Sequence, residues 1–384
     1  MAKQLTIAGL FSGVGGFEHG LHAAGHKTIY LCENWEPART VLAQHFSGVT
    51  LERDITEVFA IPRADVIVGG FPCSDLSQAG QMAGIRGGQS GLVMKALSLA
   101  KKHKSAWLVL ENVRNMLYLH GGGAMAAITG DLASAGYTWA YRLVDSRFTG
   151  VPQRRQRVIL VASRTEDPRA VLFADDAGER PASEYSDNAF GFYWTEGRGG
   201  VGWAVDAVPP LKNGSRLAIP SPPAIWMPGN DVPSRFVVPG ITTGEQLQGF
   251  PKDWTSIYEP HRRNLGTRWK MVGNAVTVGV AKWIGDRLAE PGDVPKGDDK
   301  LLATGHKWPH AAWGSRKGTF TVDVSMWPTC ARPEHLSDMM DRDFVPLSHR
   351  AAAGFCLRLE AGNLRVPAEF KVDLKEYVEF TRPG

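Results

Sequence analysis

The chain has 384 residues, enough for two or three modules and too many for one ordinary hydrophobic core. Hydrophobic residues make up 43%, which excludes a disordered protein, and no apolar run approaches the roughly 20 residues of a membrane-spanning helix. The net charge of +4 permits a polyanionic partner, and four widely spaced cysteines without a CxxC pair argue against a zinc site or a disulfide framework.

Residues 5 to about 162 alternate short β-type segments with helical stretches. This alternation predicts an α/β fold with a parallel sheet, helices on both faces, and ligand sites at the carboxyl ends of the strands. The start, "MAKQLTIAGLFSG", carries no secretory signal, so we expect a cytosolic protein. The predicted strands are "LTIAGL", "KTIYLC", "ADVIVGG", "AWLVLENV", "TWAYRLVDS" and "RVILVAS". The predicted helices span Gly16–Ala24, Glu36–Phe46, Leu92–His103 and Ala124–Ala135.

The amino-acid composition and the regularity of the hydrophobic pattern change from about Arg164. Residues 164–235 are rich in Gly, Pro and Trp and predict a loop-rich second module. Residues 273–290 predict one amphipathic helix with Asn274 near its start. "PGDVPKGDDK" has the composition of a linker, and the tail beyond it contains a helix candidate, "LSHRAAAGFCLRLE".

A glycine-rich turn follows the first predicted strand. Gly13, Gly15 and Gly16 in "GLFSGVGGFEHGL" predict a tight turn that brings backbone amides to a ligand at a helix N-terminus. Glu18 stands where the GxGxxG dinucleotide motif needs its third glycine, which argues against a nicotinamide-dependent oxidoreductase. By itself the motif fits a purely structural turn equally well.

Acidic and aromatic residues follow the next two strands. Glu33 is suited to hold the ribose hydroxyls of a nucleoside, Trp35 to stack on adenine, and Asp54 to accept a hydrogen bond from the adenine amino group. Each residue alone fits a helix cap or a surface position, but the ordered set favours an adenosine-bearing cofactor. Because no phosphate-loop lysine is present, S-adenosylmethionine fits better than ATP.

"GGFPCSDLSQAG" places Cys73 just beyond a predicted buried strand, where its side chain can meet a substrate. Glu111 closes the next long strand, and Gln153, Arg155 and Arg157 alternate along a predicted strand start, so they should point one way. A thiolate, a carboxyl and arginines beside a methyl donor suit methylation of pyrimidine carbon 5. The thiolate adds to carbon 6, the carboxyl supports a proton on nitrogen 3, and the nucleotide must first leave the duplex.

With these motifs, the sequence resembles the DNA (cytosine-5) methyltransferases of the bacterial and phage restriction–modification type. The matching segments, in family order, are "GLFSGVGGFEHGL", "GGFPCSDLS", "ENV", "QRRQR", "EQLQGFP" and "GNAVTV". The resemblance covers roughly residues 5–163 and 236–290. It implies a Rossmann-like S-adenosylmethionine-dependent methyltransferase sheet, a small loop-rich target-recognition domain and a C-terminal extension.

The resemblance also implies roles for individual residues. Cys73 would be the nucleophile, Glu111 would bind and help protonate the base, Arg155 would orient the pyrimidine, and Arg157 would support that motif. A flap of about residues 74–91 would close over the flipped base. The implied cofactor-binding residues are Phe11, Ser12, Gly13, Val14, Gly15, Gly16, Glu33, Trp35, Asp54, Ile55, Pro72, Leu92, Asn274 and Val276.

Three positions depart from the family pattern. Ser74 replaces a frequent Gln after the nucleophile. Gln246 replaces the arginine of "ERLQGFP", so we expect a structural ion pair to be missing. Gly9 stands where an aspartate is frequent, so we expect no acidic group near the methionine amine of the cofactor.

The resemblance predicts a catalytic domain over residues 1–163, completed by 272–290, a target-recognition domain over 164–271, and a linker with a C-terminal extension over 291–384. We expect a monomeric cytoplasmic enzyme of a bacterial cell or phage-infected host that needs no metal and acts on double-stranded DNA. A cognate restriction endonuclease is a candidate partner. The basic cluster Arg262, Arg263, Arg268 and Lys270 is a candidate phosphate contact. The alternatives are a tRNA cytosine-5 methyltransferase of the same fold and a non-catalytic DNA-binding regulator.

Overall fold

The chain folds into two compact units, each built from three stretches of sequence. The first comprises residues 1–148, 156–179 and 275–330, and the second comprises 149–155, 180–274 and 331–384. Within the described part of the chain, no helix is long and apolar enough to cross a membrane. The computed structural model describes residues 3–72, 91–103, 105–194, 201–211, 222–258, 265–294, 297, 299–303, 305–339 and 344–383.

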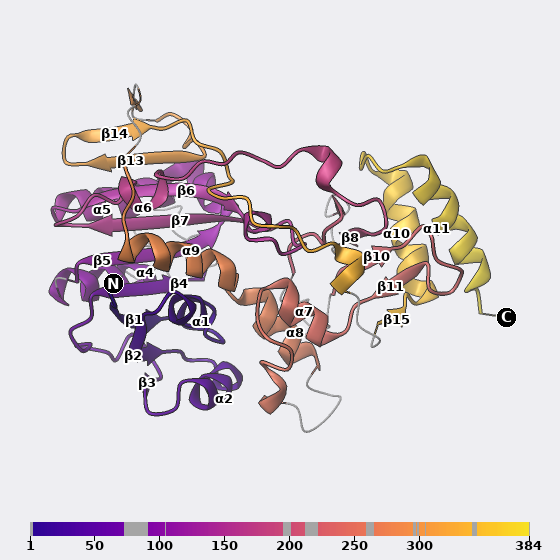
Figure 1. The fold of residues 1–384 in the computed structure, drawn as a ribbon, viewed down its shortest axis with the longest axis horizontal. Helices are drawn as coiled ribbons and strands as arrows, with labels where there is room; N and C mark the ends of the chain where they lie inside the picture. Colours follow the sequence, from indigo (N-terminus) through magenta and orange to yellow (C-terminus); the bar gives the residue numbers. More distant parts are fainter. Residues whose placement is uncertain are drawn as a thin grey trace. The chain divides into compact units, whose positions relative to one another are not determined.

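The first unit contains a large sheet with helices packed on it (Figure 1). Its strands are β1 (Thr6–Leu10), β2 (Lys27–Cys32), β3 (Thr50–Glu52), β4 (Val66–Gly70), β5 (Trp107–Val113), β6 (Thr138–Asp145), β7 (Gln156–Ser163), β12 (Lys300–Leu301), β13 (Ala311–Ser315) and β14 (Gly318–Thr321). Its α-helices are α1 (Gly16–Ala23), α2 (Glu36–His45), α4 (Gly91–His103), α5 (Gly123–Ser134), α6 (Arg169–Leu172) and α9 (Val278–Ala289).

The second unit contains a smaller sheet and four α-helices among the described residues. Its strands are β8 (Phe190–Trp194), β9 (Val201–Val205), β10 (Ala224–Trp226), β11 (Phe236–Val238) and β15 (Val345–Pro346). They are ordered β15-β11-β10-β8-β9, and every pair is antiparallel. Its α-helices are α7 (Ile241–Leu247), α8 (Leu265–Asn274), α10 (His349–Ala361) and α11 (Ala368–Phe380).

In the described residues, the large sheet has ten strands in the order β12-β14-β13-β6-β7-β5-β4-β1-β2-β3. Strands β1 to β5 pair in parallel, as the alternating sequence predicts. The prediction of a parallel sheet is wrong for β7, which runs antiparallel to both β5 and β6. A parallel pair needs a crossover of about a dozen residues, usually through a helix, whereas residues 146–155 join β6 to β7 without an α-helix.

Helices cover both faces of the large sheet, which confirms the predicted α/β class. Alternate residues of a strand point to opposite faces, so Ile7 and Ala8 enter different hydrophobic clusters. The Ala8 cluster contains buried residues of α4 and α5, and the Ile7 cluster contains buried residues of α1, α6 and α9. The strand ends described below therefore rest on a core that is closed on both sides.

The helix predicted over residues 273–290 is interrupted. Asn274 is the last residue of α8 in the second unit, and α9 begins only at Val278 in the first. At the N-cap position of α9, Thr277 has an extended backbone (φ −65°, ψ 124°). The periodicity was continuous in sequence, but the chain changes units between the two helices.

The C-terminal stretch beyond residue 300 divides between the units, which the single predicted extension did not anticipate. Strand β13 pairs with β6 and β14 with β13, so this hairpin enlarges the first unit's sheet. Helices α10 and α11 belong to the second unit, where Phe355 and Phe370 pack in one cluster with Phe192 and Phe236. The tail is therefore part of both hydrophobic cores.

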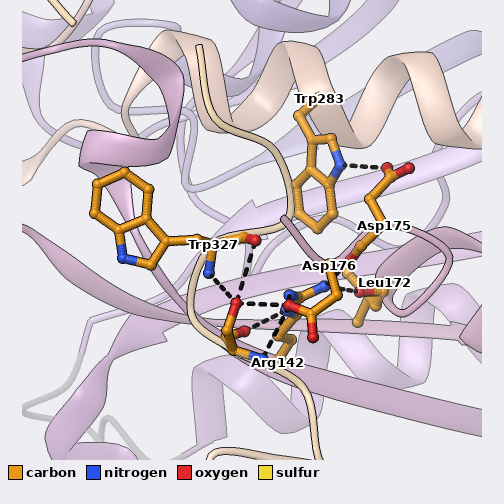
Figure 2. A network of polar contacts seen from close by, with 7 residues as sticks. Arg142, Leu172, Asp175, Asp176, Trp283 and Trp327 are labelled. Carbon is orange, nitrogen blue, oxygen red and sulfur yellow. Dashed lines mark hydrogen bonds and ion pairs between the residues drawn. The ribbon is translucent and has the colours of Figure 1, made fainter. Parts of the chain in front are cut away.

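A buried arginine ties β6 to two distant segments of the first unit (Figure 2). Arg142 has no exposed side-chain surface, and its Nη2 lies 2.7 Å from Oδ1 of Asp176. Its Nε donates to the carbonyl oxygen of Ser325 and its Nη1 to that of Leu172, both at 2.8 Å. Burial lowers the pKa of Arg142 to about 10 despite the nearby carboxylates, so the guanidinium stays charged at neutral pH.

We expect Arg142→Met to lower the free energy of unfolding by about 3 kcal/mol, because breaking a buried ion pair costs roughly 3–5 kcal/mol and Asp176 keeps 37% side-chain exposure. The control is Lys282→Met, which removes the partner of Asp286 from an exposed pair on α9 and should cost less than about 1 kcal/mol. Urea denaturation followed by circular dichroism measures both, and equal losses would contradict the assigned role of Arg142.

Candidate functional site

The turn between β1 and α1 is the first part of the candidate site. Its backbone has positive φ angles at Phe11 (55°), Gly13 (55°) and Gly15 (87°) before α1 begins at Gly16. Glycine adopts such angles freely, whereas a non-glycine residue in this region is strained, as residues at binding sites often are. The tight turn predicted from the glycines is therefore present, and it leads directly into the N-terminus of a helix.

Glu33, directly after β2, joins this turn to the start of the segment that follows β2, with one carboxyl oxygen on each side. Its Oε2 accepts a hydrogen bond from the backbone amide of Gly13, and its Oε1 accepts one from the amide of Trp35, each at 2.8 Å. Each carboxylate oxygen has a second lone pair and can still accept a hydrogen bond from a ligand hydroxyl. The structure thus brings Glu33 to the glycine turn, although twenty residues separate them in sequence.

Val276 closes against the turn and the neighbouring strand end. A Cβ atom on Gly16 would collide with the carbonyl oxygen of Val276 and lie 3.1 Å from its amide nitrogen, so only glycine permits this approach. A Cβ on Gly70, the last residue of β4, would lie 3.6 Å from Cγ2 of Val276. Residues from the start of α1, the end of β4 and the segment before α9 therefore meet at one point.

Glu111 stands beside the end of β4. The register of the β4–β5 pair places Glu111 opposite Gly70, and Oε2 of Glu111 lies 3.3 Å from the position of a Cβ on Gly70. The Nε atom of Arg157 lies 2.8 Å from Oε1 of Glu111, and Glu111 is 7% exposed. The carboxyl group is therefore held in one orientation at the carboxyl end of the sheet.

Asn112 holds the chain that leads to Cys73. Its Nδ2 donates to the carbonyl oxygen of Phe71 at 3.0 Å, and its Oδ1 accepts from the amide of Val113 at 2.8 Å. Asn112 is 3% exposed, so these bonds are protected from water. Cys73 itself and residues 74–90 of the predicted flap lie outside the described residues.

Gln153, Arg155 and Arg157 of the "QRRQR" segment do not lie on one strand face as predicted. Strand β7 begins at Gln156, and only Arg157 belongs to it. Gln153 and Arg155 precede the strand and belong to the second unit, where they are 0% and 2% exposed. The Nε2 of Gln153 donates to the carbonyl oxygen of Leu247 at 2.7 Å. Alternation alone could not reveal that the chain crosses between units here.

A buried ion pair organises α7 and α8 in the second unit. Arg268 Nη2 lies 3.0 Å from Oε1 of Glu245, and both side chains are at most 2% exposed. Thr255 donates its amide proton to the same carboxyl oxygen at 2.8 Å. Gln246 takes no part in this pair, so the expectation that the absent arginine removes an ion pair stays a prediction. The same burial excludes Arg268 as a surface phosphate contact.

The remaining predicted residues lie in both units or outside the described residues. Asp54 accepts hydrogen bonds from the amide and hydroxyl of Thr56 at 2.8 and 2.7 Å, and this pairing lowers its pKa. Asn274 is exposed at the end of α8, and Arg262 and Arg263 lie outside the described residues. Val14 and Ile55 are buried, Ser12, Trp35 and Leu92 are half-buried, and Pro72 is exposed.

Sequence reasoning treated Glu18 only as a mismatch to a glycine motif, but the structure places it beneath the turn. Glu18 lies on α1 and is fully buried, and burial raises the pKa of its carboxyl to about 7. Oε1 occupies the position that a Cβ on Gly9 would take. A signal was available in the sequence, because Glu18 follows Phe17 and precedes Leu21 on the apolar face of the helix.

Comparisons with known proteins agree with one another. A family model for C-5 cytosine-specific DNA methylases matches residues 5–190. The chain is 45% identical over 363 residues to the type II methyltransferase M2.BsuMI of Bacillus subtilis (strain 168), covering 91% of this chain and 92% of that protein. It is 31% identical over 160 residues to the type II methyltransferase M.BsuFI of Bacillus subtilis, covering 41% and 39%.

The fold comparison gives a more distant likeness. The crystal structure of the Dnmt2 methyltransferase of S. pombe matches with a TM-score of 0.55 at 15% identity. The match covers 75% of this chain and 99% of that one, and at this identity it supports the fold alone.

We expect stability to depend on pH through Glu18. Between pH 4.5, its ordinary pKa, and about 7, the folded protein keeps a proton that the unfolded chain releases, so raising the pH through this window destabilises the fold. Glu18→Gln stays neutral, so its stability relative to wild type should rise by up to about 3 kcal/mol across the window. Urea denaturation between pH 4.5 and 8 measures this, with exposed Glu57→Gln as control. A difference that stays constant with pH would refute the assignment.

Proposed function

The chain belongs to the C-5 cytosine-specific DNA methylases, and from this premise we propose that it transfers a methyl group from S-adenosylmethionine to carbon 5 of a flipped-out cytosine in double-stranded DNA. The observation that carries the proposal is the pairing of Gly70 with Glu111. It joins the strand that leads to Pro72 and Cys73 with the strand that ends in the buried carboxyl. We further propose that the protein acts in a specific sequence context in a bacterial or phage-infected cell, and the type II methyltransferases of Bacillus subtilis named above support the bacterial setting.

The glycine turn fits the adenosine and amino-acid parts of the cofactor. The turn from Phe11 to Gly16 offers backbone amides, and Glu33 keeps lone pairs for the ribose hydroxyls while fixing Gly13. Trp35 and Asp54 follow β2 and β3, the strands next to β1, which suits contacts to the adenine. When bound, S-adenosylmethionine would supply a methyl group on a positively charged sulfur.

Cys73 is the proposed nucleophile. Carbon 5 of cytosine is a poor nucleophile within the aromatic ring, and a thiolate that bonds to carbon 6 makes it enamine-like. After carbon 5 takes the methyl group it loses its proton, and the carbon–sulfur bond breaks to restore the ring and the thiolate. The thiol has an ordinary pKa near 8.5, so the site must favour the anion or couple attack to proton transfer.

Glu111 is the proposed partner of the base. A carboxyl that holds a proton at nitrogen 3 withdraws electrons from carbon 6 and so helps the thiolate to add. The ion pair with Arg157 fixes one carboxyl oxygen, while the other faces Gly70, beside the chain that leads to Cys73. Arg157 therefore positions Glu111, and we retain Arg155 as the residue that orients the pyrimidine.

We propose that DNA recognition resides in residues 164–271. Most of this stretch belongs to the second compact unit, and residues 331–384 of the tail share that unit's aromatic core, which supports including them in the recognition module. The target cytosine must leave the duplex stack before its ring face can meet a thiolate. We further propose that the enzyme acts as a monomer without a metal, with a cognate restriction endonuclease as a functional partner.

We expect Cys73→Ala to reduce formation of 5-methylcytosine in duplex DNA by at least about a thousandfold, because removal of a covalent nucleophile leaves only binding and positioning. Transfer of labelled methyl groups, followed by nucleoside analysis of the DNA, measures the rate. Cys330→Ala is the matched control, since Cys330 is exposed and should retain wild-type activity. Methylation by Cys73→Ala at the wild-type rate would rule out the proposed chemistry.

We expect duplex DNA to be the preferred substrate over tRNA. Labelled methyl transfer to DNA should be at least about tenfold faster than to tRNA at equal concentration, and tRNA should compete poorly. Bisulfite sequencing of the DNA then identifies the modified context. Preferential labelling of tRNA would instead assign the enzyme to the alternative substrate class, and binding of DNA without methylation would favour a regulator.

A further inference from the structure

Glu18 is a buried acid without a cationic partner in the described residues. Its side chain is fully buried on α1, no ion pair joins it to a described residue, and the one side chain that favours its charged form is the hydroxyl of Ser12. The charged group that does influence it is Glu33, which repels it. Burying a carboxylate without a partner is strongly unfavourable, so such a residue calls for a specific explanation.

The carboxyl lies at the base of the proposed cofactor turn. Gly9 lies on β1 two residues after Ile7, so both face the cluster that contains Phe17 and Leu21 of α1. Any side chain at Gly9 would meet Oε1 of Glu18, and its Cβ would lie 2.7 Å from Oγ of Ser12. Glu18 and Ser12 therefore fill the space that a residue on β1 would otherwise occupy.

The hydroxyl of Ser12 adds a second polar group at the same point. Its Oγ is buried beside the Glu18 carboxyl, and hydrogen bonding from this hydroxyl acts to lower the pKa of that carboxyl. Ser12 lies inside the turn that runs from Phe11 to Gly16, next to the amide of Gly13 that Glu33 fixes. A buried acid without a cationic partner and a hydroxyl beside it, both beneath a strained turn, form a polar floor that suits a cation.

We propose that Glu18, supported by Ser12, is the counter-charge for the ammonium group at the amino-acid end of S-adenosylmethionine. This inference rests on the proposed function and deepens it. S-adenosylmethionine, the ligand that the turn is proposed to hold, carries positive charge. No cationic side chain in the described residues pairs with Glu18. On this proposal, Glu18 of α1 supplies the acid that the family resemblance finds missing at Gly9.

Glu18→Gln tests the charge with little change of shape. We expect the affinity for S-adenosylmethionine and for S-adenosylhomocysteine to fall at least about tenfold in calorimetric titration, since losing one partner of a desolvated charge pair is costly. The affinity for 5′-methylthioadenosine, which lacks the amino-acid end, should stay within about twofold. Equal weakening for all three molecules, or no weakening for the first two, would overturn the inference.

Moving the acid back to β1 is the sharper test. The double variant Gly9→Asp/Glu18→Ala restores one carboxyl and relieves the collision between residues 9 and 18. We expect it to bind S-adenosylhomocysteine within about threefold of wild type. The matched control Gly9→Ala/Glu18→Ala also places a Cβ atom at position 9 but adds no carboxyl group. We expect its affinity for S-adenosylhomocysteine to be at least about tenfold weaker than that of wild type. Equal affinities for the two double variants would overturn the inference.

The same measurements distinguish three outcomes: an unfolded variant, a wrong cofactor, and a wrong role for Glu18. Glu18→Gln should be at least as stable as wild type at pH 8, so weaker binding cannot arise from unfolding. If wild type binds none of the three molecules, the proposed cofactor is wrong and this inference falls with it. If wild type binds them and Glu18→Gln binds equally well, only the role of Glu18 is wrong.

Discussion

The register between β4 and β5 is the constraint on which the candidate site depends. It sets Gly70 opposite Glu111, so the carboxyl meets the strand end that continues to Pro72 and Cys73. A shift of one residue would turn Glu111 to the other face of the sheet. The apolar residues before it, from Trp107 to Leu110, are all buried and alternate between the two cores, which prevents such a shift. The geometry of the site therefore follows from the packing of the sheet.

The protein handles buried charge in different ways at different places. Arg142 is surrounded by carbonyl oxygens and one carboxylate, and the result is a structural tie between segments far apart in sequence. Glu245 and Arg268 neutralise each other within the second unit. Glu111 is paired with Arg157 but keeps one oxygen toward the strand end. Glu18 alone among these has no cationic partner in the described residues, and this difference is the basis for proposing that it faces a ligand.

Glycine makes the close approaches at the site possible. Gly16 lets the backbone of Val276 reach the turn, and Gly9 leaves room for the Glu18 carboxyl. The same segment of chain, between α8 and α9, also returns from the second unit to the first. The family motif "GNAVTV" thus combines a crossing between units with a backbone contact to the glycine turn, which explains why residues so late in the chain belong to the candidate site.

The sequence by itself determined the strands β1, β2, β4, β5, β6 and β7, the helices that flank them and the approximate position of each motif, because hydrophobic periodicity and turn residues are local properties. It also indicated Cys73 and Glu111 through their places at strand ends. Only the tertiary structure decided that β7 is antiparallel, that Gln153 and Arg155 leave the strand, that residues 273–290 break into two helices, and that the tail joins both units. It alone revealed Glu18 as an acid beneath the turn. These features depend on contacts between residues far apart in the chain, where burial and the space left by a partner outweigh local preference.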